Sequence, residues 1–126
     1  MPITVDWDDE AHTIIRYTFQ SPWTWAEYRA AIDRAWELAR SVDHPTDTIT
    51  DMSNSRLVPD NVFRNARQSM VEIPESTRTV VIVGAGLLAE ALIAVMRRIY
   101  KKQGEKFFAA ATLGEARALI HQRRAG

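Results

Sequence analysis

The fold is decided by residues 79–92, which read TVVIVGAGLLAEAL. The four β-branched residues Val80 to Val83 are typical of a buried strand, and the glycines after them permit a sharp turn. Apolar residues then recur at helical spacing as far as Met96. The stretch therefore predicts a buried strand that turns directly into a helix packed against it.

The same stretch contains Gly84-x-Gly86-x-x-Ala89, which has the spacing of a dinucleotide-binding turn. In a nucleotide-binding fold this turn follows the first strand, and an acidic residue about 20 positions later holds the ribose. Here only 40 residues follow Gly86, and Glu105 lies before the next predicted strand instead of at its end. We interpret the glycines as a packing device and expect no cofactor. A nucleotide-binding enzyme is kept as an alternative function.

Composition favours one domain, because a chain of 126 residues with 46% hydrophobic content supports one core. Cysteine is absent, and His12, His44 and His121 are too scattered for metal-ligand spacing. We therefore expect neither disulfides nor a metal site, and the lack of cysteine fits a reducing compartment. No basic and apolar leader precedes Ile3, so a cytoplasmic location is expected.

The apolar run from Val80 to Met96 does not predict a membrane span. Two glycines and the acidic Glu90 interrupt it, and its β-branched residues are concentrated in the first half. These features favour a strand, a turn and a helix. We expect no membrane insertion.

Charge is unevenly distributed along the chain. Residues 1–60 carry 11 acidic and 5 basic side chains, and residues 61–126 carry 5 acidic and 11 basic ones. One interpretation is that the two halves fold back on each other; the other is a bipolar surface that favours self-association or an acidic partner. No interleaving of basic and aromatic residues indicates nucleic-acid binding.

The remaining elements follow from hydrophobic period and turn residues. Residues 3–7 and 13–19 predict a hairpin, and Thr24 and Glu27 have capping-box spacing at the start of a helix that runs to about Val42. A short strand at 47–52, a helix at 61–71, a strand at 106–111 and a helix from Thr112 complete the series. The predicted fold is α/β: a single domain with a mostly parallel, five-stranded mixed sheet, element order ββαβαβαβα and about four helices.

Polar residues gather after the third strand. Alternation places Asp47, Ile49 and Asp51 on one side of that strand and Thr48, Thr50 and Met52 on the other. Ligands of open α/β sheets usually bind at the carboxyl ends of the strands, although Asp51 and Ser53 are equally suited to hydrogen-bond loop amides. The candidate interaction residues in this region are Asp51, Ser53, Asn54, Ser55, Arg56, Asp60, Asn61 and Phe63.

Aromatic side chains mark the first helix. Trp23, Trp25, Tyr28 and Trp36 are interpreted mainly as core, because aromatic residues at helical spacing usually pack inward, with a ligand cage as the alternative. In the second helix the predicted apolar face is Val62, Phe63, Ala66 and Met70. Trp25 and Trp36 join the candidate ligand residues.

The order of elements resembles that of a STAS domain of the SpoIIAA-like branch, the anti-sigma factor antagonists, which is also compared with Sec14-type lipid-binding domains. The resemblance rests on the opening hairpin, the helix start at residues 24–27, and the segments at 48–53, 80–83 and 107–116. Regulatory members carry a phosphoacceptor at the start of the second helix. Here residues 58–62 read VPDNV, with no hydroxyl residue and with Asp60 in its place.

Two functions are therefore expected from the sequence. The first is a non-catalytic STAS-like module that binds a protein partner, or a second copy of itself, through the second helix and the loop from Ser53 to Asp60. The second is a protein that binds a small apolar or lipid-like molecule between the sheet and the helices carrying Trp25, Trp36, Phe63 and Met96.

Overall fold

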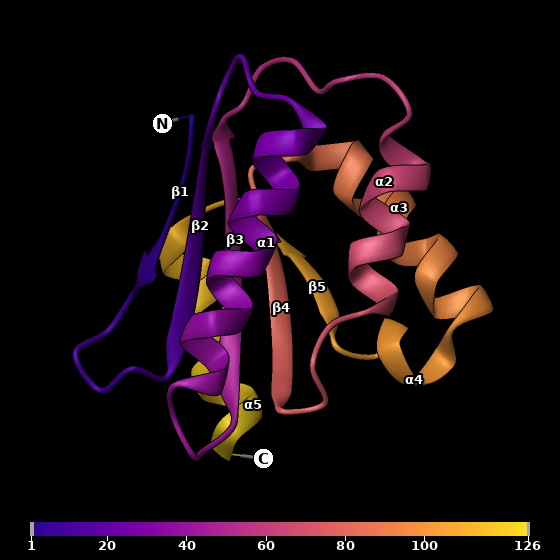
Figure 1. The fold of residues 1–126 in the computed structure, drawn as a ribbon. Helices are drawn as coiled ribbons and strands as arrows, with labels where there is room; N and C mark the ends of the chain where they lie inside the picture. The colour runs from indigo at the N-terminus through magenta and orange to yellow at the C-terminus, as the bar shows by residue number, and fades with distance from the viewer. Residues whose placement is uncertain (1, 126) are drawn as a thin grey trace.

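A computed structural model describes residues 2–125 as a five-stranded sheet with helices on both faces (Figure 1). The strands are β1 (Ile3–Trp7), β2 (Ile14–Gln20), β3 (Thr46–Asn54), β4 (Thr77–Val83) and β5 (Phe107–Ala110). The helices are α1 (Trp25–Arg40), α2 (Val62–Val71), α3 (Gly86–Ile99), α4 (Lys101–Gly104) and α5 (Leu113–Ala125). The α/β class, the mixed sheet and the order of strands and main helices are as the sequence predicts.

The sheet has the order β1-β2-β3-β4-β5, and only β1 runs antiparallel to its neighbour. Each parallel crossover leads to the adjacent strand, always on the same side of the previous one. Right-handed connections therefore place α1, α2 and α3 on one face of the sheet. Helix α5 packs on the other face, where Ala116 and Ile120 contact Ile14, Ile49 and Val81. The strand order never reverses, so the sheet lacks the crevice at which doubly wound folds bind nucleotides.

Helix boundaries differ from the sequence predictions at two places. Helix α1 ends at Arg40 instead of about Val42, because the amide of Ser41 closes its last turn on the carbonyl oxygens of Glu37 and Leu38, each at 3.1 Å. After α3 the chain leaves helical geometry at Tyr100 (φ −122°, ψ 72°) and then forms the one-turn α4. Residues 2–125 thus contain a fifth helix that the sequence did not predict.

The predicted capping box of α1 is present. The Thr24 hydroxyl accepts a hydrogen bond from the Glu27 amide at 3.1 Å, and the Glu27 carboxylate accepts one from the Thr24 amide at 3.0 Å. This reciprocal pair satisfies amides that the first helical turn leaves unbonded. It sets the position at which α1 begins, at Trp25, directly after the N-cap Thr24.

The glycine turn between β4 and α3 serves packing. Gly84 and Gly86 have φ values of 72° and 53°, in the left-handed region that glycine adopts without strain. A Cβ atom on Gly84 would lie 2.7 Å from Ser53 Oγ and 2.9 Å from Ser53 Cα. The turn can therefore approach the end of β3 only because it has no side chain there.

Ion pairs join the acidic and basic halves of the chain. Arg117 donates to the Asp8 carboxylate at 2.9 and 2.8 Å, and Arg124 contacts the Asp47 carboxylate at 2.6 Å. The hydrogen bond from Arg117 holds the pKa of Asp8 below its usual value, against the opposing effect of burial. In these pairs the two halves fold back on each other, as one of the two interpretations of the charge pattern predicted.

Candidate functional site

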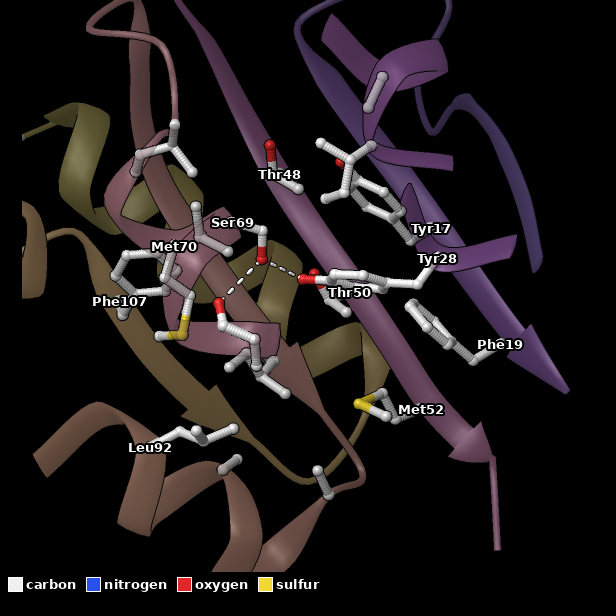
Figure 2. Close-up of a pocket in the computed structure, with 18 of the residues that line it drawn as sticks. Tyr17, Phe19, Tyr28, Thr48, Thr50, Met52, Ser69, Met70, Leu92 and Phe107 are labelled. Atoms are coloured by element: carbon white, nitrogen blue, oxygen red, sulfur yellow. Dashed lines mark hydrogen bonds between the residues drawn. The ribbon is translucent and has the colours of Figure 1, made fainter. Parts of the chain in front are cut away.

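A cavity of about 100 Å³ lies between the sheet and the helices on its α1–α3 face (Figure 2). It exists because the helices cover the sheet unevenly. Helix α1 packs on residues of β1 and β2, such as Val5, Ile15 and Phe19, whereas α3 packs on residues of β4 and β5. Thr48, Thr50 and Met52 of the central strand β3 are left only half buried, and they line the cavity.

Aromatic side chains form a large part of the cavity wall. They come from β2, from the connection that follows it, from α1 and from β5, and they are Tyr17, Phe19, Trp23, Trp25, Tyr28, Trp36 and Phe107. Trp25 packs edge to face against both Trp23 and Tyr28, with ring centroids 5.0 and 5.3 Å apart. Such edge-to-face contacts hold the rings in defined positions. The aromatic cluster is therefore part of the core, as the main interpretation predicted, and it also forms part of the cavity wall.

Polar groups also line the cavity. Thr48 and Thr50 project from β3, and Tyr28 of α1 and Ser69 of α2 are joined by a hydrogen bond that passes in front of β3 in Figure 2. Burial raises the pKa of the Tyr17 and Tyr28 hydroxyls, so both rings are neutral at physiological pH. Among the residues that the structure describes, no Asp, Glu, Lys, Arg or His lines the cavity.

The direction of the hydrogen bond between α1 and α2 can be deduced. The Ser69 hydroxyl donates to the carbonyl oxygen of Ala66 at 2.8 Å. Because a serine hydroxyl has one proton, it must accept the proton of Tyr28. The Tyr28 oxygen therefore keeps its lone pairs free to accept a further hydrogen bond.

The loop at residues 55–61, here called the covering loop, closes one end of the cavity. Trp23 Nε1 donates to Ser55 Oγ at 2.8 Å, and Trp25 Nε1 donates to the carbonyl oxygen of Asp60 at 2.6 Å. Val58 of this loop lines the cavity. The structure thus brings together Trp25, Ser55 and Asp60, three of the residues that the sequence singled out.

One hydroxyl beside the site is unsatisfied. Thr46 lies two residues before Thr48 on the same side of β3, and it is completely buried. Its Oγ1 has no hydrogen-bond partner and is the one such buried side-chain atom found in residues 2–125. The central strand therefore presents threonine at three alternate positions on the face where a packed core normally has Val or Ile.

Other predicted site residues lie away from the cavity. Asp51 is on the opposite face of the sheet, where its carboxylate accepts hydrogen bonds from the amide and hydroxyl of Ser53 at 3.0 and 2.7 Å. This is the local loop-capping role that the sequence offered as an alternative to ligand binding. Asn54, Arg56 and Asn61 are exposed around the covering loop and do not line the cavity.

Phe63 also lies outside the cavity. It is 47% exposed, so the prediction that it belongs to the buried face of α2 is wrong; buried Ser69 belongs to that face instead. Phe63 and Met96 line a second groove of about 270 Å³ between α2 and α3, beside Arg64 and Arg67. The ligand site predicted to include them thus retains Trp25 and Trp36 but not these two.

Sequence reasoning missed the polar residues of the cavity. Thr48, Thr50 and Ser69 were given no functional role, and Tyr28 was named only as part of the alternative aromatic ligand cage, not for its hydroxyl. The available signal was the alternation of Thr46, Thr48 and Thr50 in a strand predicted to lie in the middle of the sheet. A hydroxyl row on the inward face of a central strand indicates either a cavity or buried partners.

Comparison with known proteins gives no match: no protein-family model, curated protein or solved structure is similar to this chain. Within residues 2–125, no cluster of three or more His, Cys, Asp or Glu side chains is arranged to hold a metal ion. No helix in this part of the chain has both the length and the apolar character needed to cross a bilayer. The cavity is therefore interpreted from its own geometry and chemistry.

Proposed function

We propose that this protein is a non-catalytic binding module that holds a small apolar molecule in the cavity between the sheet and helices α1 and α2. The supporting observation is the cavity itself, about 100 Å³ of space walled by aromatic and aliphatic side chains. Protein interiors normally contain few voids larger than a water molecule, which needs about 10–15 Å³. Small-molecule sites are typically concave and mostly apolar with a few polar groups, as this cavity is.

The wall can adapt to an occupant. An engineered cavity of about 150 Å³ binds benzene, so the space here requires only a small expansion. Met52 and Met70 are both part of the wall, and methionine side chains rearrange readily. The covering loop is held by a few hydrogen bonds, one donated by each of Trp23 and Trp25 and two between Ser21 Oγ and the backbone of Leu57, which allows it to open for entry.

Benzene is the probe that tests this proposal. We expect benzene to raise the melting temperature in a concentration-dependent way, because a ligand that binds only the native state stabilises it. Ala66 is buried in the cavity wall, and Ala66→Leu fills part of the space and should abolish this rise. Ala118 is exposed on α5, and Ala118→Leu is the matched control that should retain it. A wild-type melting temperature that does not respond to benzene would refute the proposal.

A second candidate function is supported by exposed apolar side chains near the covering loop. Leu57 is 74% exposed and Phe63 is 47% exposed, six residues apart in the sequence, and exposed apolar side chains that gather in one region can mark an interaction site. Both lie in the region that the STAS-like resemblance assigns to partner binding. We propose that this region binds a second copy of the chain or a protein partner.

Sedimentation equilibrium and a pull-down test this second function together. If the chain self-associates, the double variant Leu57→Ser, Phe63→Ser should shift it to monomer. Ile99 is 56% exposed at the far end of α3, so Ile99→Ser is a matched control that should leave association unchanged. A monomeric wild type that also recovers no partner at native expression level argues against this role.

A further inference from the structure

We infer that the molecule held in the cavity is neutral and carries a hydroxyl or a similar hydrogen-bonding group that pairs with Thr48 and Thr50. This inference rests on the proposed binding function and specifies the chemical class of its ligand. It excludes fatty acids and other organic anions, and it excludes amines. An uncharged alcohol or phenol attached to a compact apolar body is the class that fits.

The first argument is electrostatic. Every lining residue in the described part of the chain is uncharged, and burial keeps the Tyr17 and Tyr28 hydroxyls protonated. An ion moved from water into such a wall loses its hydration without gaining a counter-ion, and that loss is far larger than the gain from one or two hydrogen bonds. The ion pair of Arg29 with Glu72 joins α1 to the end of α2 on the cavity's side of the sheet, but both side chains are more than 40% exposed and neither lines the cavity. The pair of Asp47 with Arg124 lies on the opposite face. The cavity thus selects against charge of either sign.

The second argument concerns hydrogen bonding. A purely apolar ligand would cover the half-buried hydroxyls of Thr48 and Thr50 and deprive them of water, which is costly for each hydroxyl left unpaired. A ligand hydroxyl avoids this cost because it can donate and accept at once. The Tyr28 oxygen adds an acceptor in the same cavity, since its proton is already used on Ser69.

The wall also gives the ligand an orientation. The hydroxyl groups of the wall belong to the middle of β3, to the Tyr28–Ser69 pair, to Tyr17 and to Thr77. By contrast, Trp23, Trp25 and Val58 line the end closed by the covering loop. An amphipathic ligand therefore directs its polar group toward Thr48 and Thr50. Its apolar body then lies against the aromatic rings.

Three probes of similar size separate this inference from the proposed function: benzene, phenol and benzoate, measured by calorimetric titration at pH 7. We expect benzene and phenol to bind and benzoate to bind at least about tenfold more weakly than phenol, because its carboxylate has no partner. In Thr50→Val and Thr48→Val, phenol affinity should fall about five- to tenfold, the effect of one lost hydrogen bond, while benzene affinity stays equal or increases. Thr18 lies outside the cavity on the other face of β2, so Thr18→Val is the matched control and should bind all three probes like the wild type.

The possible outcomes are distinct. If benzene and phenol both fail to bind the folded wild-type protein, the proposed function fails and this inference fails with it. If benzene binds but phenol affinity is the same in the wild type and in both threonine variants, the cavity binds apolar molecules and the inference alone is wrong. Binding of benzoate as tight as that of phenol would overturn the inference as well.

Discussion

The hydrogen bond between Tyr28 and Ser69 connects α1 to α2 across the cavity, and removing it should weaken the protein by a defined amount. The variant Tyr28→Phe deletes one hydroxyl and keeps the ring that packs edge to face on Trp25 at 5.3 Å. Ser69 keeps its own bond to the carbonyl oxygen of Ala66 at 2.8 Å. The change therefore isolates a single contact between two helices that are far apart in the sequence.

The expected magnitude follows from the chemistry of the pair. A bond between two neutral hydroxyls contributes about 0.5–1.5 kcal/mol to the free energy of unfolding. A double-mutant cycle of Tyr28→Phe and Ser69→Ala should return a coupling energy in this range. The bond from Ser69 to Ala66 is lost in both Ser69→Ala backgrounds and cancels in the cycle.

Urea unfolding followed by tryptophan fluorescence measures these free energies. Tyr17 lines the same cavity without contacting Ser69 through its hydroxyl, so a cycle of Tyr17→Phe with Ser69→Ala is the matched control and should show no coupling. If the Tyr28 cycle also gives a coupling below about 0.3 kcal/mol, the limit of simple additivity, then α1 and α2 are not joined in this way and the account of the cavity is wrong.

Three further predictions concern stability. Thr46→Val should raise the free energy of unfolding by about 1 kcal/mol, because it removes a buried hydroxyl without a partner. A lower free energy of unfolding than that of the wild type, measured in urea, would mean that the hydroxyl is hydrogen-bonded. Gly84→Ala should cost more than about 2 kcal/mol, since φ is 72° and the new Cβ meets Ser53. Gly114→Ala should not destabilise, because its Cβ would make only an ordinary contact with Thr112 Oγ1 at 3.9 Å; equal melting temperatures of the two variants would contradict this. The lowered pKa of Asp8 means that its pairing with Arg117 contributes stability above a pH of about 4, and that this contribution is lost as the pH falls through the folded-state pKa. Asp8→Asn should therefore be less stable than the wild type at pH 7 and should lose less stability in acid. Parallel acid-unfolding curves of the two proteins would refute this.

The sequence alone determined the architecture of this protein. The strand at residues 79–83, its glycine turn and the alternation of strands with amphipathic helices require a mostly parallel sheet, because each pattern carries a local period that only one element type satisfies. The capping box at Thr24 likewise located the start of α1, since the two side chains that make it are three residues apart. The same local logic placed Asp51 and Ser53 in a loop-capping pair.

The cavity was decided by the tertiary structure. Whether Trp25, Thr50 and Ser69 share one space depends on where three helices lie over the sheet, and that follows from crossover handedness and side-chain volume summed over distant segments. Phe63 shows the same limit: its helical period predicted burial, but α2 turns that position outward beside Arg64 and Arg67. A sequence shows the same row of threonines whether a helix covers it or leaves it open, so only the packed structure reveals that these residues form the floor of a cavity.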